Sequence, residues 1–409
     1  MPAKTVDANN PHNAGLLLNL IWQERSISRV ELARRSGLSR SAVAELVTEL
    51  LATELVHESG SGEHASGRPS TLLSFRDDAF VLIGVEMAAG WLHVVATDLR
   101  GCVRASRHRA HACVDHPESA LRLMQKLIDS CLEEARMPAS RLLGIGVAVP
   151  APVDPDAPDQ LHPRLLPRWQ GLSIVKTLQA AYGCRVHQEN DANVGAIAER
   201  WWGAGIGGED LAFIHLVTGV GGGLILSGQV YRGACGSAGE IGHIAIDPRG
   251  PRCMLCGLSG CLGAMIGSAQ LLQRAENLLK EGRPSRLSRH GLSVNGIVDA
   301  AHVGDPVAKQ VVGEAGQYLG IAVASLLNLL NPALVVLGGP LAAAGDLLLA
   351  PIRETLRNRT LWKSVNEARI VTSMLGESVI AVGAATCVLE SALSEPRSLR
   401  VARRTRKAG

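Results

Sequence analysis

Three short segments near the N-terminus carry apolar residues at the spacing of an α-helix. The predicted helices span residues 13–25, 28–36 and 40–53. Ser28 and Glu31 form a capping-box pattern at the start of the second helix, and Gly37 breaks the chain before the third. A strand, a Gly/Ser-rich loop over residues 58–70 and a second strand follow, which is the pattern of a β-wing. Residues 13–76 are therefore expected to fold as a winged helix-turn-helix.

The pattern changes after residue 80, where apolar runs of strand length alternate with helical stretches. The predicted strands lie at residues 81–85, 92–97, 143–149, 212–217, 224–226 and 334–337, and the clearest helices at 119–134 and 307–330. This alternation predicts an α/β architecture. We expect two lobes, at about residues 80–180 and 181–393 of a domain spanning 80–393. Residues 1–12 are expected to be disordered, and residues 394–409 to form a basic tail.

Composition bears on location more than on partners. The net charge of +3 neither requires nor excludes a polyanion. The N-terminus lacks the apolar region of a secretory signal, and no uninterrupted apolar run of about 18 residues is found. The sequence therefore predicts a cytoplasmic protein without a membrane span. In that compartment, the nine cysteines are not expected to form a disulfide framework.

The second and third helices carry candidate DNA-binding residues, because the exposed start of a recognition helix meets base edges and phosphates. The candidates are Arg34, Arg35, Ser39, Arg40, Ser41 and Ala44, with Arg68 at the foot of the wing. Glu31, Glu45, Glu49 and Glu54 in the same segment mean that bulk charge cannot supply the affinity. A dimer with two recognition helices would supply it instead. The alternative is a small helical bundle with a surface arginine cluster.

A second group of residues has the spacing of metal ligands. His243, Cys253, Cys256 and Cys261 follow the pattern H-x9-C-x2-C-x4-C in a segment with several glycines. Three thiolates and one imidazole make a closed tetrahedral set for Zn²⁺, whose role would be structural. A redox pair at Cys253 and Cys256, or reduced surface cysteines beside an unrelated histidine, are the alternatives.

Two polar motifs are candidates for ligand binding. Asn190 and Asp191 follow a short apolar stretch, and Glu240 and His243 precede the cysteines. Such carboxylates and amides suit sugar hydroxyls, and Asp191 could act as a general base in phosphoryl transfer. The alternative is that Asn190 or Asp191 caps the helix predicted at 192–201. The glycine-rich stretch at 218–223 fits an anion-binding turn or a tight hairpin equally well.

Taken together, these motifs resemble the ROK family of repressors, open reading frames and sugar kinases, and above all its xylose- and N-acetylglucosamine-responsive repressors. The resemblance covers about residues 13–393, through LVTGVGGGLILSGQVYRGACGSAGEIGH, the cysteine loop and ENDANVGAIAERWWG. It implies an actin-like ATPase fold with two α/β lobes and a homodimer or homotetramer on double-stranded operator DNA. It also implies sugar contacts by Asn190, Asp191, Glu240 and His243, with His243 also ligating zinc.

Three departures from the family pattern refine this expectation. Kinase members carry a D-x-G-G-T phosphate loop, whereas residues 86–90 read EMAAG, an acidic turn expected to repel and crowd phosphates. One extra residue separates Cys253 from Cys256, and Gly263 replaces an acid that often contacts the sugar. We therefore expect a transcription regulator, a repressor, that binds a sugar-like effector without phosphorylating it, with Asp191 as a vestigial base. A sugar kinase, or a regulator controlled by a protein partner, is the alternative.

Overall fold

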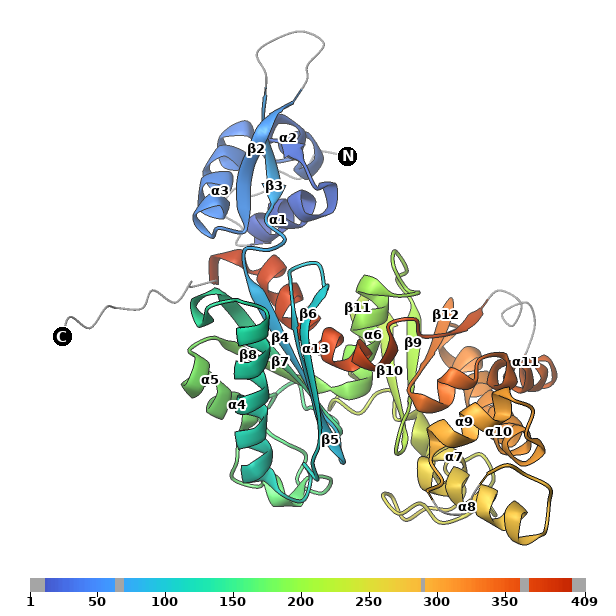
Figure 1. Ribbon diagram of the computed structural model, residues 1–409. Coiled ribbons are helices and arrows are strands. Elements are labelled where there is room, and N and C mark those ends of the chain that lie inside the picture. The colour runs from blue at the N-terminus through green and yellow to red at the C-terminus, as the bar shows by residue number, and fades with distance from the viewer. Residues whose placement is uncertain (1–11, 63–69, 288–290, 361–367, 399–409) are drawn as a thin grey trace. The chain divides into compact units, whose positions relative to one another are not determined.

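A computed structural model describes residues 12–62, 70–287, 291–360 and 368–398. The N-terminal domain is a winged helix-turn-helix, with helices α1 (His12–Glu24), α2 (Arg29–Ser36) and α3 (Arg40–Ala52) against a three-stranded sheet (Figure 1). The sheet has the order β1-β3-β2, with β1 at Ile27–Ser28, β2 at Val56–Gly62 and β3 at Ser70–Phe75. Gly37 separates α2 from α3 as predicted, whereas β2 continues to Gly62, inside the loop predicted over residues 58–70.

Local capping explains the helix-turn-helix. The Ser28 hydroxyl accepts a hydrogen bond from the Glu31 amide and caps α2, and Ser39 caps α3 in the same way through the Ala42 amide. Gly37 ends α2 with a φ of 72°, a left-handed conformation that favours glycine. Leu38 and Val43 are buried beside this turn.

A five-stranded sheet follows in the order β6-β5-β4-β7-β8. Its strands are β4 (Val81–Met87), β5 (Trp91–Thr97), β6 (Val103–Ala110), β7 (Leu142–Val149) and β8 (Arg185–Asn190). Helix α4 (Pro117–Glu134) packs on β5 and β6 of this sheet. Helix α5 (Ile174–Tyr182) contacts α4. Strand β4 is buried along its whole length, and all its residues except Glu86 are apolar, as expected for a strand covered on both faces.

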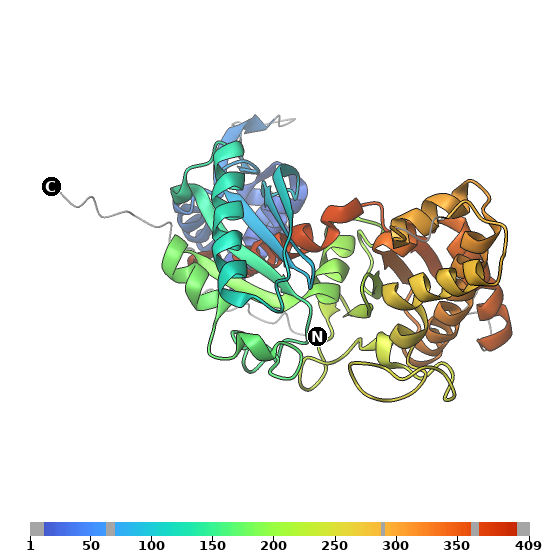
Figure 2. The same ribbon diagram turned by 60° about the horizontal axis from the view of Figure 1, so that its bottom comes forward.

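The second sheet has the order β11-β10-β9-β12-β13. Its strands are β9 (Leu211–Leu216), β10 (Val220–Leu226), β11 (Gln229–Val230), β12 (Leu334–Gly338) and β13 (Arg369–Thr372). Helix α6 (Asp191–Trp202) packs on β9 and β10. Helix α10 (Pro306–Leu330) packs against the helices α7 (Leu262–Ile266), α8 (Ser268–Lys280), α9 (Val294–His302) and α11 (Asp346–Arg359) (Figure 2).

The chain passes between its two compact units more often than the sequence predicted. One unit holds residues 1–147, 173–187 and 384–409, and the other holds residues 148–172 and 188–383. The expected division at residue 180 is therefore wrong in two respects: residues 148–172 join the second unit, and the end of helix α13 (Val379–Ser394) returns to the first. The helix-turn-helix belongs to the same unit as the first five-stranded sheet.

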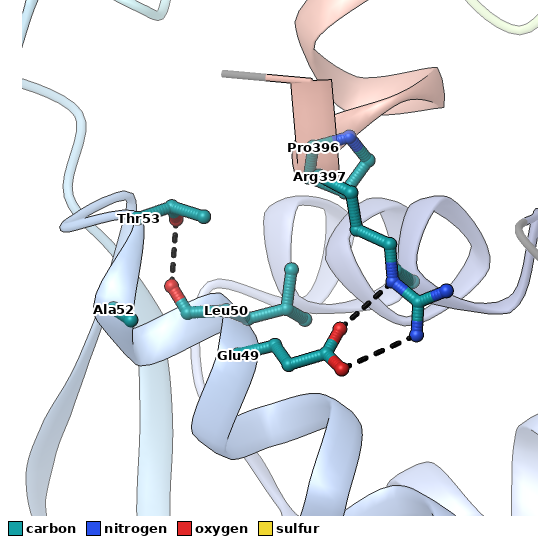
Figure 3. Close-up of a pocket in the computed structure, with 7 residues that line it drawn as sticks. Glu49, Leu50, Ala52, Thr53, Pro396 and Arg397 are labelled. Carbon is teal, nitrogen blue, oxygen red and sulfur yellow. Dashed lines mark hydrogen bonds and ion pairs between the residues drawn. The ribbon is translucent and has the colours of Figure 1, made fainter. Parts of the chain in front are cut away.

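Several contacts join the helix-turn-helix to that sheet's unit. The Arg100 guanidinium lies 4.3 Å from the centre of the Trp22 ring and donates hydrogen bonds to the Trp22 carbonyl and Asp77. Arg141 forms an ion pair with Glu54. The packed chain also extends beyond the predicted start of the tail at residue 394, because Pro396–Ser398 forms a short 3-10 helix, η6, against α1 and α3. Arg397 in η6 pairs with Glu49 of α3 (Figure 3).

Within the described residues, one helical segment, Gly376–Ser394, is long and apolar enough to cross a membrane. Sixty-seven per cent of it is buried inside the protein, as in the core helix of a globular domain. Gly383 shows how tightly this helix packs, because a Cβ atom there would lie 1.9 Å from the Val194 carbonyl oxygen of α6. Glu377 and Glu390 interrupt the segment, so it is not the uninterrupted apolar run that the sequence analysis looked for.

Replacement of Gly383 by alanine is expected to destabilise the protein by about 1–3 kcal/mol or more, because the backbone of α6 cannot move away without losing its packing. Gly313→Ala in α10 is a matched control, since nothing lies within 4 Å of the added Cβ atom. That control is expected to stabilise by about 0.5–1 kcal/mol. Thermal unfolding compares the two, and equal melting temperatures for both variants would contradict the close contact of α13 with α6.

Candidate functional site

The start of α3 presents the predicted DNA-contact residues to solvent. Ser39, Arg40, Ser41 and Ala44 are exposed, whereas the intervening Ala42 and Val43 are buried. The Ser39 hydroxyl also lies 3.0 Å from the Ser41 hydroxyl, which orders the first turn of the helix. This end of α3 is therefore open to a ligand along one side.

The arginines of this domain differ in their partners. Arg34 forms an ion pair with Glu31 at 2.6 Å, and this hydrogen-bonded pair lowers the pKa of Glu31 and raises that of Arg34. Arg35 pairs with Glu24 at 2.5 Å. Arg40 is exposed and forms no ion pair with an acid among the described residues. The predicted residue Arg68 lies outside the described residues.

Asn190 and Asp191 lie at the junction of β8 and α6. The Asn190 side-chain oxygen accepts hydrogen bonds from the amides of Ala192 and Asn193, so Asn190 is the N-cap of α6. Its side-chain amide donates to the Ala151 carbonyl at 3.2 Å and to Asp191 at 3.1 Å. The capping role considered for Asn190 is thus confirmed, and all its hydrogen-bonding groups are engaged within the protein.

Asp191 keeps one carboxylate oxygen for a ligand or a neighbour. Oδ1 accepts from the Ala192 amide at 2.7 Å, while Oδ2 lies 3.7 Å from Nδ1 of the buried His215 on β9. The side chain of Asp191 is 25% exposed. The sequence analysis did not identify His215, although this residue lies near the end of β9, just before the glycine-rich stretch.

An ion pair between the buried Glu189 and the half-buried Arg232 supports the same junction. Glu189 accepts hydrogen bonds from Arg232 through one oxygen, and from the Asn190 amide and the Asn193 side chain through the other. These contacts hold Asn190 and Asn193, at the start of α6, in place. Arg232 was missed from the sequence because it lies 43 residues away, in the loop after β11.

Glu240 and His243 face each other across one turn of a short 3-10 helix, η3 (Ile241–His243), with Nε2 of His243 3.9 Å from Glu240. Burial raises the pKa of Glu240, and the negative charge of Asp191 raises it further, whereas His243 and His162 act in the opposite direction. Asp191, Glu240 and His162 are therefore electrostatic neighbours within one unit. His162 belongs to the segment 148–172 that the sequence assigned to the other lobe.

The four predicted metal ligands do come together. One donor atom from each of His243, Cys253, Cys256 and Cys261 lies within 4.8 Å of all the others. Cys256 and Cys261 place their sulfur atoms 3.4 Å apart, and Cys253 lies 3.8 Å from Nδ1 of His243. A tetrahedron with Zn–S bonds of about 2.3 Å has edges of about 3.8 Å, so this donor set fits a zinc ion.

The cysteine loop is held by its backbone in spite of the extra residue between Cys253 and Cys256. The Cys253 amide donates to the Leu258 carbonyl at 2.7 Å, and Gly260 (φ 72°) lies so close to Asp247 that a Cβ atom would be 1.5 Å from its carbonyl oxygen. The Leu258 backbone lowers the pKa of Cys256 to about 7. Burial, followed by the neighbouring sulfur atoms, raises the pKa of Cys261 to about 12. A cation would relieve this crowding of thiols.

The turn at residues 86–90 differs from its expected form. Glu86 lies in β4, and its buried side chain is 3.7 Å from Nδ1 of His93 on β5. Only Ala88, Ala89 and Gly90 form the turn, which the Ala88 amide closes on the Trp91 carbonyl. The expectation of an acidic turn is therefore wrong, because the strand extends to Met87. Ala88 and Ala89 do lie in the turn, as expected from the sequence.

The glycine-rich stretch at residues 218–223 forms a hairpin. Of the two interpretations from the sequence, an anion-binding turn and a tight hairpin, the hairpin is therefore confirmed. Strands β9 and β10 pair antiparallel, with Gly221, Gly222 and Gly223 inside β10. A Cβ atom at Gly223 would lie 2.1 Å from the Ala192 carbonyl oxygen, so glycine lets β10 approach the first turn of α6. These glycines serve packing beside Asp191.

Both domains match known families. The description "Winged helix-turn-helix DNA-binding" matches residues 14–56, and "ROK family" matches residues 82–391. The chain is 29% identical over 389 residues to the xylose repressor of Caldicellulosiruptor bescii, covering 94% of this chain and 97% of that one. A crystal structure of a ROK family transcriptional regulator, a homologue of the Escherichia coli MLC protein, superposes with a TM-score of 0.81, at 27% identity over 95% and 98% of the two chains.

A ROK family glucokinase from Streptomyces griseus, solved with glucose and AMPPNP, superposes with a TM-score of 0.66 at 27% identity. It covers 75% of this chain and 98% of its own, so about a quarter of this chain has no counterpart in the kinase. The fold thus defines a protein that joins a winged helix-turn-helix to a sugar-kinase-like domain of two α/β lobes. The chain belongs to the ROK family and is one of its transcriptional regulators with a DNA-binding helix-turn-helix.

Proposed function

We propose that this protein is a cytoplasmic, sequence-specific repressor whose sugar-kinase-like domain binds a sugar or sugar derivative without phosphorylating it. The observation that carries the proposal is the union, in one chain, of an exposed recognition helix and a sugar-kinase-like domain. Relatives similar along nearly the whole chain support it, since one is a xylose repressor and another a transcriptional regulator.

In this proposal, the start of α3 enters the major groove of operator DNA. Arg40, Ser39, Ser41 and Ala44 read base edges or hold phosphates, because all four side chains are exposed there. Arg34 and Arg35 would have to leave Glu31 and Glu24 before they contact a phosphate. Since ion pairs reduce their available charge, a homodimer or homotetramer with paired recognition helices supplies the remaining affinity.

The effector site consists of Asn190, Asp191, Glu240 and His243. The free Oδ2 of Asp191 and the carboxylate of Glu240 are acceptors for sugar hydroxyls, and Nε2 of His243 is a further contact. Asn190 would need to release the Ala151 carbonyl before donating to a sugar, so its main task is to hold Asp191 in place. The xylose repressor among the relatives supports a sugar as the ligand class.

The absence of phosphoryl transfer is inferred from the β4–β5 turn. Ala88 and Ala89 stand where kinase members of the family carry the paired glycines of the phosphate loop, and their Cβ atoms crowd a bound phosphate. Asp191 then retains the position of a general base without a phosphoryl donor. The alternative function, a sugar kinase, draws on the same Asp191 and on the similarity to the glucokinase.

We also infer that His243, Cys253, Cys256 and Cys261 hold a structural Zn²⁺. The ion would take thiolates and a neutral imidazole, and would neutralise the crowded sulfur atoms. His243 would bind it through Nδ1, which faces Cys253, and leave Nε2 toward Glu240. The metal site thereby orients one contact of the effector site.

Helix α13 provides a route between effector and operator. It begins in the unit that holds α6 and ends in the unit that holds the helix-turn-helix, where η6 contacts α3. A ligand that favours one arrangement of the two units would therefore favour one placement of α3. An effector with equal affinity for both arrangements would leave operator binding unchanged.

Arg40→Ala is expected to weaken binding to the selected operator by about 1–3 kcal/mol, or roughly 5–150-fold. The substitution removes an exposed guanidinium that forms no ion pair with an acid among the described residues. Arg34→Ala is the matched control and should have a much smaller effect, since Glu31 engages Arg34. The operator is first selected from random duplexes, and affinity is measured by fluorescence anisotropy. Full affinity in Arg40→Ala would contradict the assignment.

The purified protein is expected to contain about one zinc per chain, measured by mass spectrometry of the metal. Cys261→Ser should lose most of this zinc and unfold at a lower temperature, whereas Cys102→Ser, an exposed cysteine outside the cluster, should retain both. A chelator should lower the melting temperature of the native chain toward that of Cys261→Ser. Unchanged zinc content in Cys261→Ser would exclude the proposed site.

A panel of pentoses, hexoses and N-acetylhexosamines is expected to contain a ligand that raises the melting temperature, since ligands stabilise the state they bind. Asp191→Asn should abolish that shift, and Asp346→Asn, whose side chain is 89% exposed on α11, should preserve it. The same sugars are tested for ATP consumption in a coupled assay. Turnover that disappears in Asp191→Asn would favour the kinase alternative.

A further inference from the structure

The loop that carries the cysteines exposes a group of large apolar side chains. Met254, Leu255 and Leu258 are 92%, 69% and 67% exposed. They are three of the twelve large hydrophobic residues that are exposed in the described part of the chain, and they lie within one run of five residues. Single apolar residues on a surface are ordinary, whereas a contiguous group marks a contact with a protein or a membrane. We call Met254, Leu255 and Leu258 the apolar tip.

The cysteine loop lies directly before α7 (Figure 1), and its own backbone holds the turn that carries the apolar tip. The Cys253 amide donates a hydrogen bond to the Leu258 carbonyl at 2.7 Å, and the Gly257 amide donates to the Cys253 carbonyl at 2.9 Å. Gly257 has a φ of 75°, which lets the chain reverse direction there. The turn is therefore ordered before a partner arrives, and this lowers the entropy cost of binding.

The apolar tip contributes nothing to the core beneath it. The buried apolar cluster of this loop consists of Cys253, Cys261 and Ala264. Met254 and Leu255 lie between two cysteines of the candidate zinc site, yet both are exposed to solvent. Because these side chains stabilise no core of the chain itself, their exposure points to a partner outside the chain.

Positive charge flanks the apolar tip. Residues 248–259 contain two arginines and no acid. The Arg249 side chain is 94% exposed and lies 3.8 Å from Asp247, a contact that is weak at such exposure. Arg252 forms no ion pair with an acid among the described residues, and its Nε donates to the Gly257 carbonyl at 2.9 Å. The partner must therefore accept apolar side chains and cations at one place.

The size of this surface favours a membrane over a protein. A specific protein interface takes about 20–30 residues from each side. The apolar tip and its two arginines supply five, all on one turn. A bilayer needs no matching shape, since its acyl region accepts apolar side chains and its anionic headgroups attract arginines. An anionic phospholipid surface is therefore the partner that these residues fit.

We propose that the cysteine loop is a peripheral membrane-binding element. In this proposal, Met254, Leu255 and Leu258 enter the boundary between headgroups and acyl chains, and Arg249 and Arg252 bind anionic headgroups. Such a contact lies at the membrane surface and needs no spanning helix. It is independent of operator and effector binding, so it can fail while the proposed function stands.

The test measures how the full-length protein co-sediments with vesicles of phosphatidylcholine, with or without about 30% phosphatidylserine. The native protein is expected to bind the anionic vesicles. Joint replacement of Met254, Leu255 and Leu258 by serine should weaken this binding at least about 100-fold, because full burial of one such side chain contributes about tenfold or more. Arg249→Gln should weaken it about fivefold, and only when phosphatidylserine is present.

The matched control removes three exposed apolar side chains elsewhere in the chain. Ile206, Val303 and Leu329, which are 67%, 64% and 80% exposed, are jointly replaced by serine. This control should bind vesicles as the native protein does. Native melting temperatures and zinc contents in both triple variants show that the cysteine loop remains folded.

Tryptophan fluorescence locates the contact. On addition of anionic vesicles, the emission of Leu255→Trp should move to shorter wavelengths beyond the response of the native protein, because the ring enters an apolar environment. Leu329→Trp, at an exposed position on α10, should respond as the native protein does.

Two vesicle results would overturn the proposal: no binding of the native protein to anionic vesicles, or undiminished binding of the serine variant of the apolar tip. A third contrary result would come from size-exclusion chromatography with light scattering. If the tip variant loses an oligomer that the native protein forms, and vesicles bind neither, the apolar tip is an interface between copies of this chain. Operator binding by Arg40→Ala tests the proposed function separately.

Discussion

The start of helix α6 is the position on which the proposed effector site depends, and two glycines fix it. Gly223 of β10 lies against the Ala192 carbonyl, and Gly383 of α13 lies against the Val194 carbonyl, at distances that leave no room for a Cβ atom. Within this frame, Asn190 caps the helix and holds Asp191 through its side-chain amide. Backbone packing therefore determines where the Asp191 carboxylate stands, and Glu189 with Arg232 secures the strand before it.

Helix α13, which packs on α6 through Gly383, is shared by the two units. Gly383 is the last residue of α13 in its unit, and the next residue already belongs to the unit of the helix-turn-helix. Contacts of α1 with residues at and beyond the end of α13 lie on the route that the proposed function assigns to this helix.

The helix-turn-helix was predictable because its signals are local. Ser28, Gly37 and Ser39 act within three or four residues, so their caps and turn follow from the sequence alone. The cysteine cluster was also predictable, since its three thiols fall within nine residues. Contacts between distant segments were not, and Arg35–Glu24, His215–Asp191 and Arg232–Glu189 are examples. The lobe boundary failed for the same reason, because α13 returns to a unit that the chain had left about 200 residues earlier.

The helix-turn-helix is balanced in charge, with seven arginines and seven glutamates in residues 13–76. Under the proposed function, such a domain gains little from non-specific attraction, so the exposed Arg40 and hydroxyls would contribute mainly where the groove matches them. Ion pairs such as Arg34–Glu31 lower the charge available to any duplex, which weakens wrong sites as much as right ones. Specificity is a difference of affinities, and removing uniform attraction from the reading head leaves that difference intact.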